Sequence, residues 1–401
     1  MGMKVVYILP TSVGGLPHYV AELANAVANY ANVTVIKPIK TTADNIFSNN
    51  VKIVNAFKPF IISFASLAKG EISFTSIKNI ISYNNINVIG KINPDIIHFA
   101  ADLPPILEIF TYLHKLDVKY RTVVTFHDYI PRRSIILRRG RELLADAPFL
   151  TVIAQNINNL LNLLKPEIKI DGIIVHSKKT KEKLIKSGVS RRVYVIPHGV
   201  YTFFRELNHA RSIKEENNCI LFFGNICPVK GLDTLIKAIP IIAKKIPDVK
   251  LIIAGDGVIP KKNWQIIEKY KSNFEIHNYF IPNEEVGKFF SRACIVVIPN
   301  RRQEGHSGSL TVAYSFGKPV VTTNVGEFPI LVKEAGCGLV VPPENPKALA
   351  EAIIKLLRDE NLRKKMSKNA LKMAEKLSWD NIAKMHIKVY EEVLNERRSR
   401  S

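Results

Sequence analysis

The chain has 401 residues, and its 57 Lys and Arg against 35 Asp and Glu give a formal net charge of +22. This length is enough for two ordinary domains, and a hydrophobic content of 47% excludes an intrinsically disordered chain. No apolar run reaches the roughly 18 residues that a membrane-spanning helix needs. The amino terminus enters a strand-like segment with no signal-peptide cleavage pattern, so we expect a cytoplasmic protein.

Short apolar strands alternate with helices through the first half of the chain. A helix is predicted at residues 19–30, where apolar side chains recur at helical spacing, and Gly14 and Gly15 precede it. The strands are predicted at residues 4–9, 33–36, 96–99, 123–126 and 172–176. This alternation predicts a parallel, doubly wound sheet.

The same alternation restarts at residue 220, after a polar stretch at 197–218 without clear periodicity. Further strands are predicted at residues 220–223, 250–254, 274–277, 295–298, 320–322 and 339–341. We therefore predict an α/β fold with two Rossmann-like domains facing across a cleft. One covers residues 1–200 and is completed by a carboxyl-terminal helix within 379–401, and the other covers 206–378.

Two loops in the second half have the character of phosphate-binding loops. In the stretch EGHSGSLTVAYSFGKP (304–319), Ser307, Gly308 and Ser309 begin a predicted helix, whose first N–H groups and positive dipole end suit an anion. The earlier stretch FFGNICPVKG has a strand, a turn at Gly224, and then Lys230. Two such loops indicate a ligand that contains a diphosphate.

Composition limits the other ligands. The four cysteines form no CxxC pair, so their spacing favours neither a metal site nor a disulfide framework, and Cys294 is expected in the core. The basic residues are not interleaved with aromatic ones, which argues against nucleic acid. An anionic membrane surface and phosphorylated substrates remain as explanations of the charge.

One local basic cluster suits a membrane contact, because basic side chains flank a small apolar group. The alternative is a solvated surface helix. The residues of this predicted contact are Arg132, Arg133, Ile135, Ile136, Leu137, Arg138, Arg139 and Arg141.

Ten short motifs in chain order resemble the retaining glycosyltransferases of family 4, which have the GT-B fold, and they extend over nearly the whole chain. They are GGLPHYVAELA, PDIIH, TFHD, VIPHGV, FFGNICPVKGLDTLIKA, LIIAGDG, EGHSGS, GKPVV, VGEFP and GLVVPPEN. The resemblance implies a nucleotide-sugar donor bound mainly by the second half and an acceptor bound mainly by the first. It also implies transfer with retention of the anomeric configuration, with no metal ion or other cofactor.

The resemblance also implies roles for individual residues. Lys230 would offset charge on the leaving diphosphate, His127 would contact the donor sugar, and Glu304 would lie beside the transferred sugar. The residues expected to bind the donor and its phosphates are Gly14, Gly15, Gly224, Asn225, Lys230, Ser307, Gly308, Ser309, Leu310 and Glu327.

Two departures from the family pattern are visible. The family often has an arginine near the position of Lys230, whereas this chain has Asn225 and Cys227 there. The second glutamate of the family's pair is replaced by Val312, although a branch of the family shares the pattern SGxLxxAYxFGKPVV. We expect a lipid-linked or membrane-proximal acceptor, with the protein at the inner face of the membrane. The alternatives are a soluble-acceptor glycosyltransferase and a non-catalytic nucleotide-sugar-binding subunit.

Overall fold

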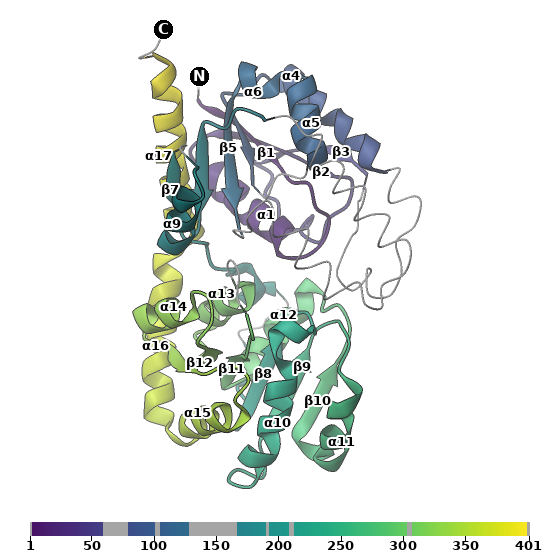
Figure 1. Cartoon of the computed structure of the whole chain (residues 1–401), viewed down its shortest axis with the longest axis vertical. Helices are drawn as coiled ribbons and strands as arrows, with labels where there is room; N and C mark the ends of the chain where they lie inside the picture. The colour runs from purple at the N-terminus through teal and green to yellow at the C-terminus, as the bar shows by residue number, and fades with distance from the viewer. Residues whose placement is uncertain are drawn as a thin grey trace. The chain divides into compact units, whose positions relative to one another are not determined.

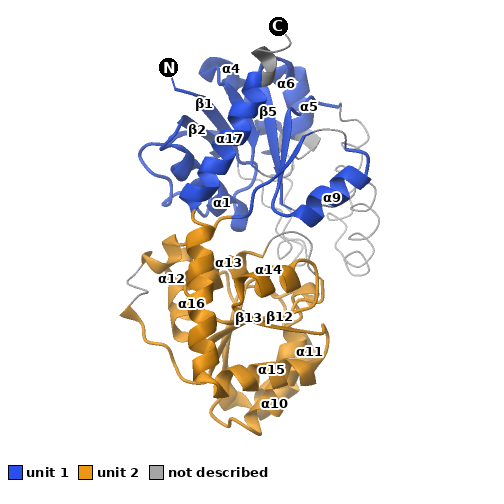
Figure 2. Ribbon diagram, turned by 90° about the vertical axis from the view of Figure 1, so that its left-hand side faces the viewer, with its two compact units in different colours: residues 1–198, 379–401 blue, residues 199–378 orange. Residues whose placement is uncertain are grey.

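The computed structural model describes residues 2–58, 79–100, 105–127, 167–189, 192–207, 212–302 and 307–398 (Figure 1). The chain divides into two compact units, which Figure 2 colours separately. Unit 1 comprises Met1–His198 and Trp379–Ser401, and unit 2 comprises Gly199–Ser378.

The described residues of unit 1 form a seven-stranded parallel sheet in the order β3-β2-β1-β4-β5-β6-β7. The strands are β1 (Lys4–Ile8), β2 (Asn32–Pro38), β3 (Lys52–Phe57), β4 (Ile96–Phe99), β5 (Arg121–Phe126), β6 (Gly172–Val175) and β7 (Val193–Val195). The helices are α1 (Gly15–Val27), η1 (Asn79–Val88), α4 (Ile89–Ile92), α5 (Pro105–Leu113), α6 (Leu116–Lys119), α9 (Lys178–Lys186) and α17 (Trp379–Arg398). The strand order reverses between β1 and β4.

Alternate side chains of the unit 1 sheet face different layers. Val6, Ile97 and Val124 join a buried apolar cluster that includes Ile86 of η1 and Leu107 of α5. Since side chains alternate along a strand, their sequence neighbours lie on the opposite face.

A buried polar network holds the carboxyl-terminal helix to that opposite face. The Tyr390 hydroxyl of α17 is 2.8 Å from the Tyr7 hydroxyl and 2.6 Å from His98 Nδ1. His98 Nε2 is in turn 2.7 Å from Thr125 Oγ1. Buried polar groups lose stability when they lack partners, so this network favours one register of α17 on the sheet. Helix α17 also packs against α1.

The described residues of unit 2 form a six-stranded parallel sheet in the order β10-β9-β8-β11-β12-β13. The strands are β8 (Cys219–Phe223), β9 (Lys250–Ala254), β10 (Phe274–His277), β11 (Ile295–Ile298), β12 (Val320–Thr323) and β13 (Gly338–Val341). The helices are η2 (Phe203–Arg205), η4 (Pro228–Lys230), α10 (Leu232–Ala243), α11 (Lys261–Lys269), η5 (Lys271–Asn273), α12 (Asn283–Arg292), α13 (Gly308–Ser315), α14 (Phe328–Ala335), α15 (Pro346–Arg358) and α16 (Glu360–Lys376).

The predicted α/β class with two doubly wound parallel sheets is confirmed, as are strands such as β4, β9 and β11. Cys294 is 3% exposed, as expected for a core residue. Strands β3 and β7, the two edge strands of the unit 1 sheet, were not predicted from the sequence. Only one of the six residues of β3 is buried, and β7 has only three residues, so neither has the continuous apolar run of a central strand.

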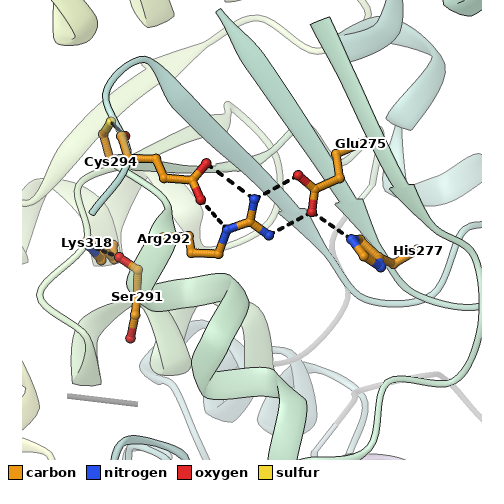
Figure 3. A network of polar contacts seen from close by, with 7 residues as sticks. Glu275, His277, Ser291, Arg292, Cys294 and Lys318 are labelled. Atoms are coloured by element: carbon orange, nitrogen blue, oxygen red, sulfur yellow. Dashed lines mark hydrogen bonds and ion pairs between the residues drawn. The ribbon is translucent and has the colours of Figure 1, made fainter. Parts of the chain in front are cut away.

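An ion-pair network supports unit 2 (Figure 3). Arg292, at the end of α12, donates from both terminal nitrogens to Glu275 of β10 at 2.7 Å, and its Nε donates to Glu216. The guanidinium lowers the pKa of Glu275 to about 2, with a smaller contribution from His277 Nε2 at 2.8 Å. Because this pKa is depressed, the pair stabilises the fold above pH 4.5 and loses that contribution as the pH falls toward 2.

Replacing Arg292 with methionine is expected to lower the free energy of unfolding of unit 2 by about 1–3 kcal/mol, since it leaves two carboxylates facing each other. Urea unfolding at pH 7 would measure the change. The matched control is Lys364→Met. Lys364 forms an ion pair with Glu360 at the surface, where the two side chains are 69% and 65% exposed. That pair is expected to contribute little, because water and salt screen exposed charges. Equal effects of the two substitutions would contradict the prediction.

Candidate functional site

The two predicted phosphate-binding loops meet in unit 2 at the point where its strand order reverses. Strands β8 and β11 are neighbours, and ligands of doubly wound sheets bind at the carboxyl ends of the strands beside such a reversal. The hydroxyl of Ser309, in the first turn of α13, donates to the carbonyl of Phe223, at the end of β8, at 3.0 Å. The structure therefore brings Gly224 and Ser309 together.

Three glycines allow the loops after β8 and β9 to touch through their backbones. Gly224 has φ 122, and a Cβ on Gly255 would lie 1.9 Å from the carbonyl oxygen of Gly224. A Cβ on Gly257 would lie 2.1 Å from the carbonyl oxygen of Ile226. Gly255 and Gly257 belong to the motif LIIAGDG, but the motif alone predicts no role for them. Their function follows only from the contact between the two loops.

The amino end of α13 offers hydrogen-bond donors. Gly308 and Ser309 occupy its first turn, where helical N–H groups have no acceptor within the helix, whereas the N–H of Leu310 donates to Ser307 O at 3.1 Å. The Ser307 hydroxyl is buried and has no hydrogen-bond partner among the described residues. An unsatisfied buried hydroxyl is unfavourable, so this end of α13 suits a ligand with acceptor oxygens.

Lys230 ends the short helix η4 in the loop after β8 and is half-buried. The next residue, Gly231, has φ 66, and a Cβ there would lie 2.0 Å from the carbonyl oxygen of Pro299, beyond β11. The N–H of Arg301 also donates to Val229 O at 2.8 Å. The turn that contains Lys230 is thus fixed against the segment that follows β11, while Asn225 is exposed in the same loop.

Arg301 is already paired. Its Nη2 donates to the buried Asp233 carboxylate at 2.6 Å, and its Nε lies 3.1 Å from Glu344. These two carboxylates offset its charge, so Arg301 is poorly suited to replace the arginine that the family pattern often has. Glu327 is half-buried at the amino end of α14, after β12, the neighbour of β11.

In unit 1, Gly14, Gly15 and His127 follow two strands of the same sheet, β1 and β5. Gly14 has φ 88 and, with Gly15, begins α1 after β1, while His127 follows β5. Strand β4 lies between β1 and β5. Because all these strands are parallel, both loops lie at the carboxyl edge of the unit 1 sheet.

His127 lies in a cluster of rings. Its Nε2 is 3.0 Å from Ala100 O, and its Nδ1 is 3.0 Å from Nε2 of His176. The ring of Tyr19 meets that of His127 edge to face at 4.5 Å between centroids. Desolvation lowers the pKa of His176 to about 4. His176 was predicted only as the end of a strand, because nothing in the local sequence GIIVH indicates its contact with His127.

Buried histidines make the stability of unit 1 sensitive to acid. Desolvation lowers the pKa of His176 and of His386 to about 4 and that of His98 well below its usual value. Each pKa is lower in the folded protein than in the unfolded chain. The unfolded state therefore binds more protons below about pH 6.5, and stability falls as the pH falls from 6.5 toward 4.

Lowering the pH from 7 to 5 is expected to reduce the stability of unit 1 by about 2 kcal/mol for each histidine with a pKa of about 4. The chain has two tryptophans, the buried Trp379 in unit 1 and Trp264 in unit 2. Trp379 fluorescence during urea unfolding of a Trp264→Phe protein would measure the change. His386→Met should flatten the pH dependence, and an unchanged slope in that variant would contradict the prediction.

Several predicted residues lie outside the described part of the chain. They are Glu304 and the predicted membrane contact Arg132, Arg133, Ile135, Ile136, Leu137, Arg138, Arg139 and Arg141. Of the described helices, none combines the length and apolar character needed to cross a bilayer. Within the described ranges, no group of three or more His, Cys, Asp and Glu side chains is arranged to hold a metal ion.

Family models match both halves of the chain. The model described as Glycosyltransferase Family 4 matches residues 13–202, and the model described as Glycosyl transferases group 1 matches residues 204–373. An uncharacterized glycosyltransferase of Methanocaldococcus jannaschii is 31% identical over 224 residues, which cover 54% of this chain and 55% of that protein. The chain thus spans little more than half the length of this relative.

Solved glycosyltransferase structures share the fold over nearly the whole chain. Sucrose-phosphate synthase from Thermosynechococcus elongatus superposes with a TM-score of 0.69 at 18% identity, covering 98% of this chain and 100% of that one. WaaG, a glycosyltransferase involved in lipopolysaccharide biosynthesis, gives 0.64 at 18% identity, covering 97% and 99%. Anabaena HepE in complex with UDP and glucose gives 0.64 at 16% identity, covering 97% and 100%.

Proposed function

Because the chain belongs to glycosyltransferase family 4 and has the GT-B fold, we propose that it moves a sugar from a nucleotide-diphosphate sugar to a lipid-linked or membrane-proximal acceptor. The transfer retains the anomeric configuration and uses no metal ion. The observation that carries the proposal is the meeting of the Gly224 loop with the amino end of α13 at the strand reversal of unit 2.

Unit 2 receives the donor in this proposal. The N–H groups of Gly308 and Ser309 and the hydroxyl of Ser307 donate to the diphosphate, and the positive end of the α13 dipole favours its charge. Gly224 lets the backbone approach the ligand, and Asn225 and Glu327 complete the contacts. The complex of HepE with UDP and glucose supports a nucleotide-sugar donor.

The reaction separates charge, and the proposed residues stabilise it. Negative charge grows on the diphosphate as its bond to the anomeric carbon breaks, and positive charge grows on the sugar. The ammonium of Lys230 and the α13 donors offset the first, while Glu304 lies beside the sugar and stabilises the second. His127 contacts the sugar, and Gly14 and Gly15 bring backbone against the donor or acceptor. The acceptor hydroxyl attacks from the face that the diphosphate leaves and gives its proton to the departing phosphate oxygen, so the configuration is retained.

A lipid-linked acceptor accounts for the basic character of the chain. The net charge of +22 favours contact with anionic lipids at the cytoplasmic face of a membrane. In unit 1, the nine-residue helix α9 has five lysines and one glutamate, and its Ile185 is 53% exposed. Basic residues beside an exposed apolar side chain suit a membrane interface, as does the predicted contact at Arg132–Arg141.

The experiment that tests the function is release of nucleoside diphosphate from a panel of UDP- and GDP-sugars, with a membrane lipid extract added or omitted. Wild-type protein and Lys230→Ala would be compared. We expect release from one donor that depends on the lipid and is lost in the variant.

Release that needs only a soluble sugar or sugar phosphate would favour a soluble-acceptor enzyme. Binding of a nucleotide sugar without release under any condition would favour a non-catalytic binding subunit. The absence of the usual arginine near Lys230 and the presence of Val312 are the observations that favour the non-catalytic subunit.

A further inference from the structure

The hydrogen bonds of His176 fix the position of its proton. Its Nδ1 is 3.0 Å from the carbonyl oxygen of Ile196, and a carbonyl oxygen only accepts, so Nδ1 bears a hydrogen. A neutral imidazole with a hydrogen on Nδ1 has a lone pair on Nε2. That Nε2 faces Nδ1 of His127 at 3.0 Å.

His127 also has a hydrogen-bond partner at each ring nitrogen. Its Nδ1 faces the lone pair of His176, and its Nε2 is 3.0 Å from Ala100 O, which also only accepts. With His176 neutral, both hydrogen bonds form only when both nitrogens of His127 bear hydrogens. We propose that His127 is a protonated imidazolium and that His176 is its positioning residue, accepting the hydrogen bond from His127 Nδ1. This inference rests on the proposed role of His127 in sugar transfer and adds a residue to it.

The surroundings favour placing the additional proton on His127 and not on His176. Desolvation lowers the pKa of His176 to about 4, so this ring remains a neutral acceptor near pH 7. Among the described residues, the titratable groups near the pair include Tyr19 of α1, His98 of β4 and His386 of α17. They also include His198, whose ring centroid lies 5.2 Å from that of His176. Burial lowers the pKa of His98 and His386 and raises that of Tyr19, so these three groups are uncharged near pH 7.

The arrangement gives His127 a defined chemical role. The Nδ1–H of His127 donates to His176. The Nε2–H of His127 can therefore donate to a ligand oxygen in place of Ala100 O. A charged donor of this kind binds a sugar hydroxyl oxygen or a phosphate oxygen of the donor substrate. It has no lone pair with which to take a proton, so His127 acts as a hydrogen-bond donor and not as a general base.

Two variants at position 176 separate positioning from packing. His176→Phe keeps a ring but has no acceptor for His127, whereas His176→Gln has an amide that can donate to Ile196 O and accept from His127. The full chain labelled with ¹⁵N-histidine would report the protonation of each His127 nitrogen by NMR between pH 5 and 9, with His127→Ala assigning the signals. Thermal unfolding of each variant would verify that it folds.

We expect wild-type His127 to have hydrogens on both nitrogens at pH 7. In His176→Phe, the pH at which His127 loses its second ring hydrogen should fall by about one unit or more, because a hydrogen bond that stabilises the charged ring is removed. His176→Gln should restore most of the shift. In the assay of nucleoside diphosphate release, the alkaline limb of the pH profile of kcat/KM should shift to lower pH in His176→Phe by the same amount.

An unprotonated Nδ1 in wild-type His127, or His127 signals that are the same in His176→Phe, would overturn the proposal. If the NMR signals shift as expected but release by His127→Ala equals that of wild type, the proton assignment stands. In that case the role of His127 in transfer is wrong. A wrong proton assignment and a wrong role of His127 in transfer therefore give different results.

Discussion

Replacing Lys230 with alanine is expected to reduce the turnover number for sugar transfer at least about 100-fold and to leave the fold intact. The diphosphate gains negative charge as the glycosidic bond breaks, so a fixed ammonium stabilises the transition state more than the ground state. The half-buried position of Lys230 and the backbone contact of its turn with Pro299 limit its freedom to move. The loss should therefore appear mainly in kcat, and a smaller change is expected in KM.

Lys244→Ala is the matched control for this variant. Lys244 is an exposed lysine that follows the carboxyl end of α10, whereas Lys230 precedes the amino end of the same helix. Both variants remove one positive charge from unit 2, so a general effect of net charge would be equal in the two. Steady-state release of nucleoside diphosphate, with circular dichroism to verify folding, measures the difference. If both variants turn over at near wild-type rates, Lys230 does not have the proposed role.

The parts of this protein that the sequence predicts well are those encoded by local runs. Buried parallel strands such as β9 and β11 are continuous apolar segments, and each is followed by a loop whose glycines or serines stand out. The parallel order then implies that the loops after β8 and β11 meet, which the bond between Ser309 and Phe223 shows. Partly buried edge strands such as β3 lack this signal.

Pairings between distant segments are not encoded locally, and they account for what the sequence analysis missed. His176 contacts His127 because β5 and β6 are neighbours, a fact that neither local segment contains. Arg292 is placed between Glu216 and Glu275 by three separate segments of unit 2. The same holds for Gly255. A side chain at this position would overlap the carbonyl oxygen of Gly224, which lies 31 residues earlier in the chain.

Replacing Gly255 with alanine is expected to destabilise unit 2 by about 3 kcal/mol and to weaken binding of a nucleoside diphosphate at least about tenfold. Gly255 has φ 155, and its new Cβ would lie 1.9 Å from the carbonyl oxygen of Gly224. Backbone atoms on both sides leave no flexible side chain to move away, so one loop must shift. Any shift strains the 3.0 Å bond from Gly224 N to Ala254 O and moves Gly224 relative to Ser309. Urea unfolding and calorimetric titration with UDP and GDP measure the two effects.

Gly188→Ala separates the steric overlap from backbone strain. Gly188 follows α9 in unit 1, and its φ of 87 is also unfavourable for alanine, but a Cβ there would meet nothing within 4 Å. It should lose only about 1 kcal/mol of stability and none of the nucleotide affinity. If Gly255→Ala behaves like Gly188→Ala in both measurements, close contact of the β8 and β9 loops is not required for the donor site. A larger loss in both would show that the position of Gly224 depends on the absence of a side chain at Gly255.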